Sequence, residues 1–145
     1  MRRARASALG LVGVVALLVG AARHEKLRGV FEAPVELGVW SEIPAAATYT
    51  SFWAPAGDRF RVRAAWPEAQ NALTLAVGSG VLPPGGDEDD ARETQLSSAV
   101  SQRGEEVSLD LTIPKGHNFG YARLYPAGYG ERPMRLRIDR VRGRK

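Results

Sequence analysis

The chain has 145 residues, of which 44% are hydrophobic and 25% charged, a composition suited to one globular domain with a single core. It contains no cysteine, which excludes disulfides, thiolate metal sites and cysteine nucleophiles. Its net charge of +4 is carried by the two ends, because residues 27–131 hold eight basic and fourteen acidic side chains, so the basic isoelectric point does not indicate a nucleic-acid partner.

Residues 1–26 have the pattern of an export signal or of a membrane anchor. Three arginines among the first five residues precede a run of seventeen uncharged residues, 6–22, which ends in small side chains. A helix of that length rises about 25 Å, close to the lower limit for crossing a bilayer. A cleaved signal peptide and a retained single-span anchor, which would attach the chain to the membrane, therefore both remain open. Either one places residues 27–145 outside the cytoplasm, in the periplasm or at the cell surface.

Residues 27–145 predict one all-β domain behind this N-terminal hydrophobic helix. Short stretches alternate apolar and polar side chains with the period of two typical of strands, and Gly and Pro separate them. The predicted strands lie within 29–40, 47–53, 58–66, 71–78, 105–113, 119–125 and 132–139. No amphipathic helix is available to connect parallel strands. The pattern therefore favours a single antiparallel β-sandwich, jelly-roll-like, with about eight strands.

In the most regular stretches the alternation also predicts which side chains face the core. The predicted inward residues are Phe60, Val62, Ala64 and Trp66; Leu73, Leu75 and Val77; Val107, Leu109, Leu111 and Ile113; and Met134, Leu136 and Ile138. The residues between them are mostly arginine, serine, threonine and aspartate, as expected for a wet face.

One predicted loop, residues 78–93, combines Pro and Gly with four consecutive acids. Clustered carboxylates suit a hard cation such as calcium, with Asp87, Asp89 and Asp90 as the candidate ligands. The spacing does not match an EF-hand, and consecutive acids cannot all point at one ion. A solvated surface loop without metal is the favoured interpretation.

Signatures of catalysis are scarce, and neither an enzyme nor a cofactor is expected. The sequence contains no phosphate-binding loop, no zinc-protease motif and no nucleophile elbow. A Ser-His-Asp set would have to combine His117 with Asp110 and an unidentified serine. The acids of 105–110 look like solvent-facing residues of one strand, which disfavours a glycosidase pair.

The stretch 119–130 carries the strongest hint of a binding function. As a strand it places Phe119, Tyr121, Arg123 and Tyr125 on one face. Aromatic rings beside polar groups on a sheet are what a sugar-binding surface uses, because the rings stack on sugar C–H faces. The candidate ligand-binding residues are Tyr121, Arg123, Tyr125, Asn118, Tyr129, Trp53 and Trp66. A purely structural role for these rings, or contact with a protein partner, remains open.

Two stretches, DRFRVRAAW at 58–66 and RLRIDRV at 135–141, resemble the paired strands of galactose-binding-like, carbohydrate-binding jelly-roll domains. The resemblance extends from Phe52 to Val141 and consists of strand pattern. It implies ligand binding by loops at one end of the sandwich, without catalysis. It also implies a structural calcium, for which the acidic loop is the only candidate.

The C-terminal strand and tail form a predicted basic surface. Its members are Arg135, Arg137, Arg140, Arg142 and Arg144. They would bind an acidic glycan, a lipid head group or an anionic protein, or else keep an edge strand from pairing. The sequence as a whole favours a non-catalytic binding module of the cell envelope, with carbohydrate as the ligand class. The alternatives are an accessory subunit of an envelope protein complex and, less favoured, a small hydrolase.

Overall fold

The described part of the protein is all-β. The computed structural model describes residues 31–32, 35–68, 72–86, 90–128 and 130–142. Within these ranges there is no α-helix, and hence none long and apolar enough to cross a membrane. The predicted signal or anchor, residues 1–26, lies outside the described residues.

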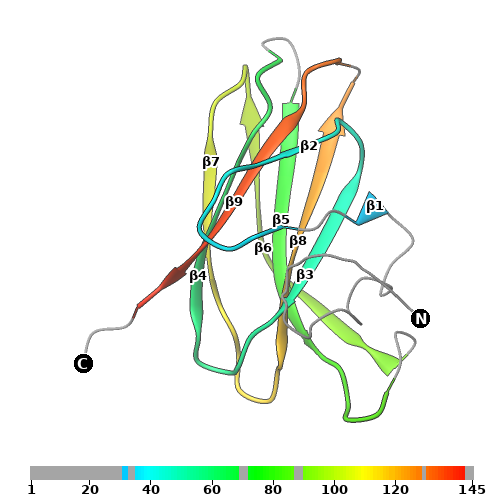
Figure 1. The fold of residues 1–145 in the computed structure, drawn as a ribbon, viewed down its shortest axis with the longest axis vertical. Coiled ribbons are helices and arrows are strands. Elements are labelled where there is room, and N and C mark those ends of the chain that lie inside the picture. Colours follow the sequence, from blue (N-terminus) through cyan, green and yellow to red (C-terminus); the bar gives the residue numbers. More distant parts are fainter. Residues whose placement is uncertain (1–30, 33–34, 69–71, 87–89, 129, 143–145) are drawn as a thin grey trace.

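Nine strands of the described chain form two sheets that pack face to face (Figure 1). Their bounds are β1 Phe31–Glu32, β2 Ser41–Ile43, β3 Thr48–Trp53, β4 Arg59–Ala65, β5 Ala72–Val81, β6 Arg92–Gln102, β7 Val107–Thr112, β8 Phe119–Ala127 and β9 Met134–Val141. Sheet A has the order β1-β3-β8-β5-β6, and sheet B the order β2-β9-β4-β7. The two-residue β1 runs parallel to β3, and the other eight strands make two four-stranded antiparallel sheets.

The connections between these eight strands are those of a jelly roll. The chain passes from β2 in sheet B to β3 in sheet A, back to β4, and then across again to the hairpin of β5 and β6. It returns through β7, β8 and β9, changing sheet at each step. The antiparallel β-sandwich of about eight strands that the sequence predicts is therefore confirmed.

The core lies between the two sheets, and the predicted inward side chains form it. All of them are buried except Val107 and Leu109, which are partly buried because β7 is an edge strand of sheet B. Phe52 of sheet A and Phe60 of sheet B meet edge to face across the layer, with ring centroids 4.9 Å apart. Burial of this apolar layer is the main source of stability for the sandwich.

The sequence pattern misses β6. Apart from Leu96 and Val100, which are exposed, its side chains are small or polar, as in the segment Ser97–Ser98–Ala99, so the contrast between a dry and a wet face is weak. This weakness follows from its place at the edge of sheet A. The loop predicted at 78–93 is also shorter than expected, because β5 continues to Val81 and β6 begins at Arg92.

The core assignment predicts a large difference between neighbouring positions of β7. Leu111→Ala removes a fully buried side chain and is expected to cost about 2–5 kcal/mol of unfolding free energy. Thr112→Ala, one residue further on the exposed side, is the matched control and is expected to cost less than about 1 kcal/mol. Chemical denaturation measures both values. Equal losses in the two variants would contradict the placement of the core.

Candidate binding face on sheet A

Strand β8 turns its small side chains inward and its large ones outward. Ala122 and Leu124 belong to the core between the sheets, while Phe119 and Tyr121 lie on the opposite, outer side of sheet A. Arg123 shares that outer side, since it follows Tyr121 by two residues along the strand. The sequence predicts this division of the strand, but it does not predict what happens to the rings.

The rings are buried although they lie outside the inter-sheet core. Together with β3 and the β5–β6 hairpin they form an outer cluster, which consists of Tyr49, Leu82, Ala91, Phe119 and Tyr121, with Trp53 packed against it. The rings of Tyr49 and Tyr121 stack with their centroids 5.7 Å apart. Tyr121 is only 3% exposed, so its ring serves as packing rather than as a surface for a ligand.

Two glycines of β5 provide the flat floor on which the outer rings lie. Gly78 pairs with Tyr121 and Gly80 with Phe119 across the sheet. A Cβ atom at Gly78 would lie 2.5 Å from Cζ of Tyr121, and one at Gly80 would lie 2.5 Å from Cζ of Phe119. Glycine within a strand marks a close approach of other atoms. The Gly-Ser-Gly segment of β5 was therefore the sequence signal that could have revealed this cluster.

An ion pair lies at the centre of the outer cluster. The Arg123 guanidinium donates to Oε1 of Glu93 at 2.7 Å, and the Tyr49 hydroxyl donates to Oε2 of the same carboxylate at 2.6 Å. The guanidinium also lies over the rings of Tyr49 and Tyr121, 4.6 and 5.3 Å from their centroids. The Arg123 and Glu93 side chains are 16% and 11% exposed, so each charge is compensated at the place where it loses water.

The same network shifts the proton equilibria of its members. Burial raises the pKa of Tyr49 well above its usual value, and the negative charge of Glu93 raises it further. Burial and Glu93 likewise raise the pKa of Tyr121. Partial burial works against the charged form of Arg123, but its hydrogen bond to Glu93 outweighs this and raises the pKa of the guanidinium.

Next to the buried cluster, the outer side of sheet A carries an exposed and uncharged surface. Tyr125 of β8, 40% exposed, is aligned across the sheet with Thr74 of β5 and then Val100 of β6. Further along β6, towards its N-terminal end, Ser98 and Gln95 lie on the same outer side of sheet A. We call these five residues the tyrosine face. It offers one accessible ring among hydroxyl and amide groups.

The other residues predicted to bind ligand have different places. Both polar atoms of the Asn118 side chain bond to the backbone of Leu82, Nδ2 to its O at 2.8 Å and Oδ1 to its N at 2.9 Å, which fastens the β7–β8 turn to the end of β5. Trp66 is buried in the inter-sheet core and donates its Nε1–H to the carbonyl of Arg132. Trp53 belongs to the outer cluster, and Tyr129 lies outside the described residues.

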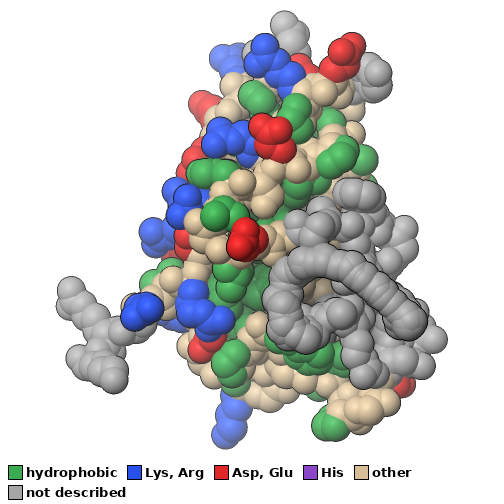
Figure 2. All heavy atoms as spheres, viewed as in Figure 1, with side chains coloured by type: hydrophobic (Ala, Val, Ile, Leu, Met, Phe, Trp, Pro, Cys, Tyr) green, Lys and Arg blue, Asp and Glu red, His purple; other side chains and the backbone are tan. Residues whose placement is uncertain are grey.

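The predicted basic surface is largely compensated by acids and rings. Arg137 pairs with Asp139 at 2.9 Å, Arg140 pairs with Asp58, and Arg135 stacks on the ring of Trp40 with its guanidinium 4.5 Å from the centroid. On the side of the molecule over β9, β4 and β7, basic and acidic side chains alternate (Figure 2). Arg142 is exposed, and Arg144 lies outside the described residues.

Ion pairs also link the strands of sheet B across its outer side. Arg63 of β4 binds Asp139 of β9 at 2.9 Å, and Arg61 of β4 binds Asp110 of β7 at 3.2 Å. Asp139 loses some water, but its hydrogen bonds to Arg137 and Arg63 outweigh that loss and lower its pKa. This side is therefore a solvated surface of mixed charge, and anion binding by its arginines stays a prediction.

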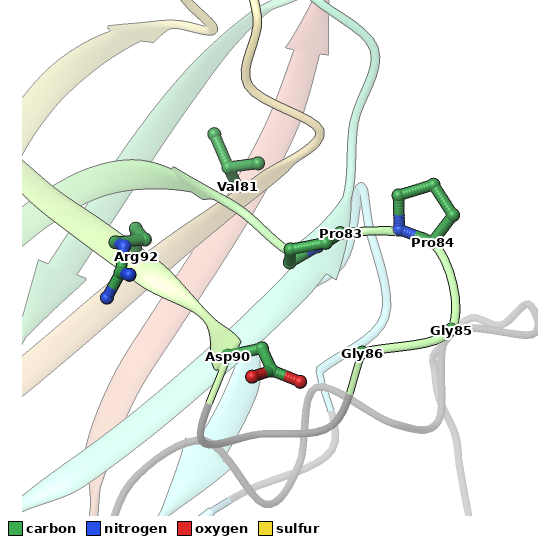
Figure 3. Close-up of a pocket in the computed structure, with 7 residues that line it drawn as sticks. All are labelled: Val81, Pro83, Pro84, Gly85, Gly86, Asp90 and Arg92. Carbon is green, nitrogen blue, oxygen red and sulfur yellow. The ribbon is translucent and has the colours of Figure 1, made fainter.

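The acidic loop does not form a metal site within the described residues. Asp87 and Asp89 lie outside them, and no group of three candidate ligands occurs among the rest. Asp90 is exposed and lines an open hollow beside the β5–β6 hairpin, together with Arg92 and Gly86 (Figure 3). Calcium binding by this loop stays a prediction.

His117 does not belong to a Ser-His-Asp set with Asp110. Its Nδ1 lies 2.7 Å from Oγ of Ser79, a serine that is fully buried and so cannot reach a substrate. Asp110 instead pairs with Arg61 on the outer side of sheet B. The bond between His117 and Ser79 instead ties the β7–β8 turn to β5.

No known protein family and no curated protein matches the sequence. Solved structures do match the fold. The pre-peptidase C-terminal domain of a collagenase from Bacillus anthracis has a TM-score of 0.50 at 10% identity, covering 77% of this chain and 97% of that one. The periplasmic g-type lysozyme inhibitor PliG from Aeromonas hydrophila has a TM-score of 0.47 at 12% identity, covering 77% and 96%.

A xylan-binding domain of carbohydrate-binding module family 22 also matches, with a TM-score of 0.42 at 15% identity, covering 83% of this chain and 92% of that one. The collagenase domain, at a TM-score of 0.50, shares its fold with this chain. At these identities the likeness is one of fold alone.

The flat floor of the outer cluster predicts that β5 does not accept a side chain at two positions. Gly78→Ala and Gly80→Ala are each expected to lower the unfolding free energy by about 1–3 kcal/mol, because the new methyl group overlaps both a ring and a backbone carbonyl oxygen of β6. Thr74→Ala, on the same strand and the same side, is the control and should change stability by less than about 1 kcal/mol. Thermal denaturation compares the three. A Gly78→Ala variant as stable as the parent would contradict the close packing of the Tyr121 ring and of the β6 backbone against this position.

The raised pKa of Tyr49 predicts a loss of stability at alkaline pH. Because the folded protein keeps the phenol proton to a higher pH than the unfolded chain, this contribution is complete below pH of about 10 and declines above it. Tyr49→Phe lacks the titrating hydroxyl, so the stabilities of parent and variant should converge as the pH rises beyond that point. Denaturant unfolding between pH 8 and 11.5 measures the two curves. Curves that stay parallel over this range would show that Tyr49 does not titrate differently on folding.

Proposed function

We propose that the protein is an extracytoplasmic, non-catalytic binding module whose tyrosine face holds an uncharged glycan. The observation that carries this proposal is the exposed ring of Tyr125 among uncharged hydrogen-bonding groups, held on the rigid support of the outer cluster. The basic start and apolar run of residues 1–26 support a place outside the cytoplasm.

The chemistry of the face matches that of a sugar. A ring stacks on the apolar C–H side of a pyranose, while hydroxyl and amide groups bond its hydroxyls. Tyr125 would supply the ring, and Thr74, Ser98 and Gln95 would supply the polar groups. These residues stand on three neighbouring strands, each about 4.8 Å from the next, so the face spans about 10 Å across the strands. From Thr74 to Gly78, which pairs with Gln95, it extends about 13 Å along β5, so the face is large enough for a short oligosaccharide.

The charges around the face favour a neutral ligand. The nearest ionised groups of the outer cluster, Arg123 and Glu93, already neutralise each other. The arginines that would attract an acidic polymer lie on sheet B, where carboxylates compensate most of them. This arrangement supports a glycan without carboxylate or sulfate groups over an acidic one.

The proposal predicts that one exposed ring matters for binding and not for folding. Tyr125→Ala is expected to lower glycan affinity at least tenfold, about 1.4 kcal/mol, while the thermal midpoint changes little. A glycan array with uncharged and acidic polysaccharides identifies the ligand, and calorimetry with the best one measures the affinity. Because the ligand carries no charge, raising the salt concentration should leave the affinity unchanged.

Trp40→Ala provides the matched control, since Trp40 stacks with Arg135 and Arg63 of sheet B, away from the tyrosine face. This variant should bind the glycan like the parent. Tyr121→Ala should instead unfold more easily, by about 3–5 kcal/mol, because its ring is buried. The proposal fails if no uncharged glycan on the array binds, or if Tyr125→Ala binds as tightly as Trp40→Ala.

A further inference from the structure

The sheets of the described chain end in four edge strands, and three of them are protected against pairing. β1 and β2 are only two and three residues long. β7 carries Asp110 at its middle and follows directly on Glu105 and Glu106, so another strand laid against it would meet negative charge. Short strands and charged strands are the usual means by which a sheet edge avoids association.

The fourth edge, β6, is neither short nor charged, and its one protective feature is a β-bulge at Leu96. It is eleven residues long, and between Glu93 and Arg103 it contains no charged residue and no proline. Within the described chain β6 pairs only with β5, so the backbone groups on its far side from Thr94 to Ser101 have no strand partner. A long uncharged edge is a template for a further strand.

Two apolar side chains stand out along this edge. Leu96 is the extra residue of a β-bulge, because Ser97 pairs with Val77 while Gln95 pairs with Gly78. Its side chain is 44% exposed, and that of Val100 is 56% exposed. Both side chains lie beside polar residues on a surface where water contact costs them free energy.

The sequence of β6 is complementary to itself. Suppose that two β6 strands pair antiparallel about a two-fold axis perpendicular to the sheet. Facing residues must lie on the same side of the sheet, so one residue of β6 then faces its own copy. With the axis at Ser98, Leu96 faces Val100 of the second copy, and this apolar pair occurs twice. With the axis at Ser97, Leu96 faces Ser98; with the axis at Ala99, Leu96 faces Gln102.

Among these three registers, only the one at Ser98 places the two exposed apolar side chains against each other. The flanking charges do not select a register, because the bulge at Leu96 shifts the side of the sheet on which Glu93 lies, and Arg103 and Glu105 come after the end of β6.

We propose that β6 pairs with β6 of a second copy of this chain, antiparallel and centred on Ser98, which joins the two A sheets into one. This pairing shares Ser98 and Val100 with the tyrosine face, but it does not depend on glycan binding. Each copy contributes Leu96 and Val100 to the junction, and the tyrosine faces of both copies come to lie on the same side of the joined sheet.

The absence of cysteine from the chain allows a direct test. Ser98→Cys in the full-length protein places two thiols on facing residues, whose Cα atoms are about 4.5–5.5 Å apart in an antiparallel pair, within the range of a disulfide. Ser108→Cys, equally exposed but on β7, is the matched control. Cells that produce each variant are treated with a mild oxidant, and non-reducing gels measure the covalent dimer.

The proposal expects the dimer of the Ser98→Cys variant to form at least tenfold faster than that of the Ser108→Cys control. Adding Val100→Lys to Ser98→Cys should slow this reaction severalfold, because it places a charge against Leu96 twice, while the exposed position leaves the thermal midpoint unchanged. Equal rates for the two cysteine variants, no effect of Val100→Lys, or cross-linking of the Ser98→Cys variant to a different protein would each overturn the pairing. Glycan binding by Tyr125 is measured independently of these rates.

Discussion

The ion pair between Arg123 and Glu93 allows sheet A to bury aromatic rings on its outer side. A guanidinium that loses most of its water is very unfavourable without a partner, and here the partner comes from β6, two strands away. The same carboxylate accepts the hydroxyl of Tyr49, and the guanidinium lies over two rings. Three strands are thereby joined by side chains as well as by backbone bonds, which gives Tyr125 a fixed support.

The outer sides of the two sheets differ in the side chains that cover them. Sheet B covers its strands with arginines and carboxylates in pairs, an arrangement that remains soluble and resists other strands. Sheet A carries a compensated ion pair, buried rings and the uncharged tyrosine face. A surface of mixed charge discriminates poorly between neutral ligands, whereas a ring among hydroxyls and amides can select one. This contrast is the reason that the proposed site lies on sheet A.

The fold was accessible from the sequence because the inter-sheet layer imposes a period of two on β4, β7 and β9. The outer cluster was not accessible in the same way, since its members come from strands 30 to 44 residues apart in the chain and no local pattern links Glu93 to Arg123 or to Tyr49. The strand pattern of β8 left two choices, aromatic rings in the core or rings in water. The structure shows neither, because glycines in β5 make room for a second buried layer.

Gly78 and Gly80 also determine which positions on the outer side of sheet A tolerate substitution. Any larger residue at these two positions overlaps a ring and a backbone carbonyl of β6, so they do not accept a side chain as long as the outer cluster persists. Thr74, Gln95 and Ser98 lie at the surface of the same sheet, where this steric constraint does not apply. Substitutions at these surface positions, during evolution or in a designed library, can therefore change the ligand without disturbing the buried outer cluster.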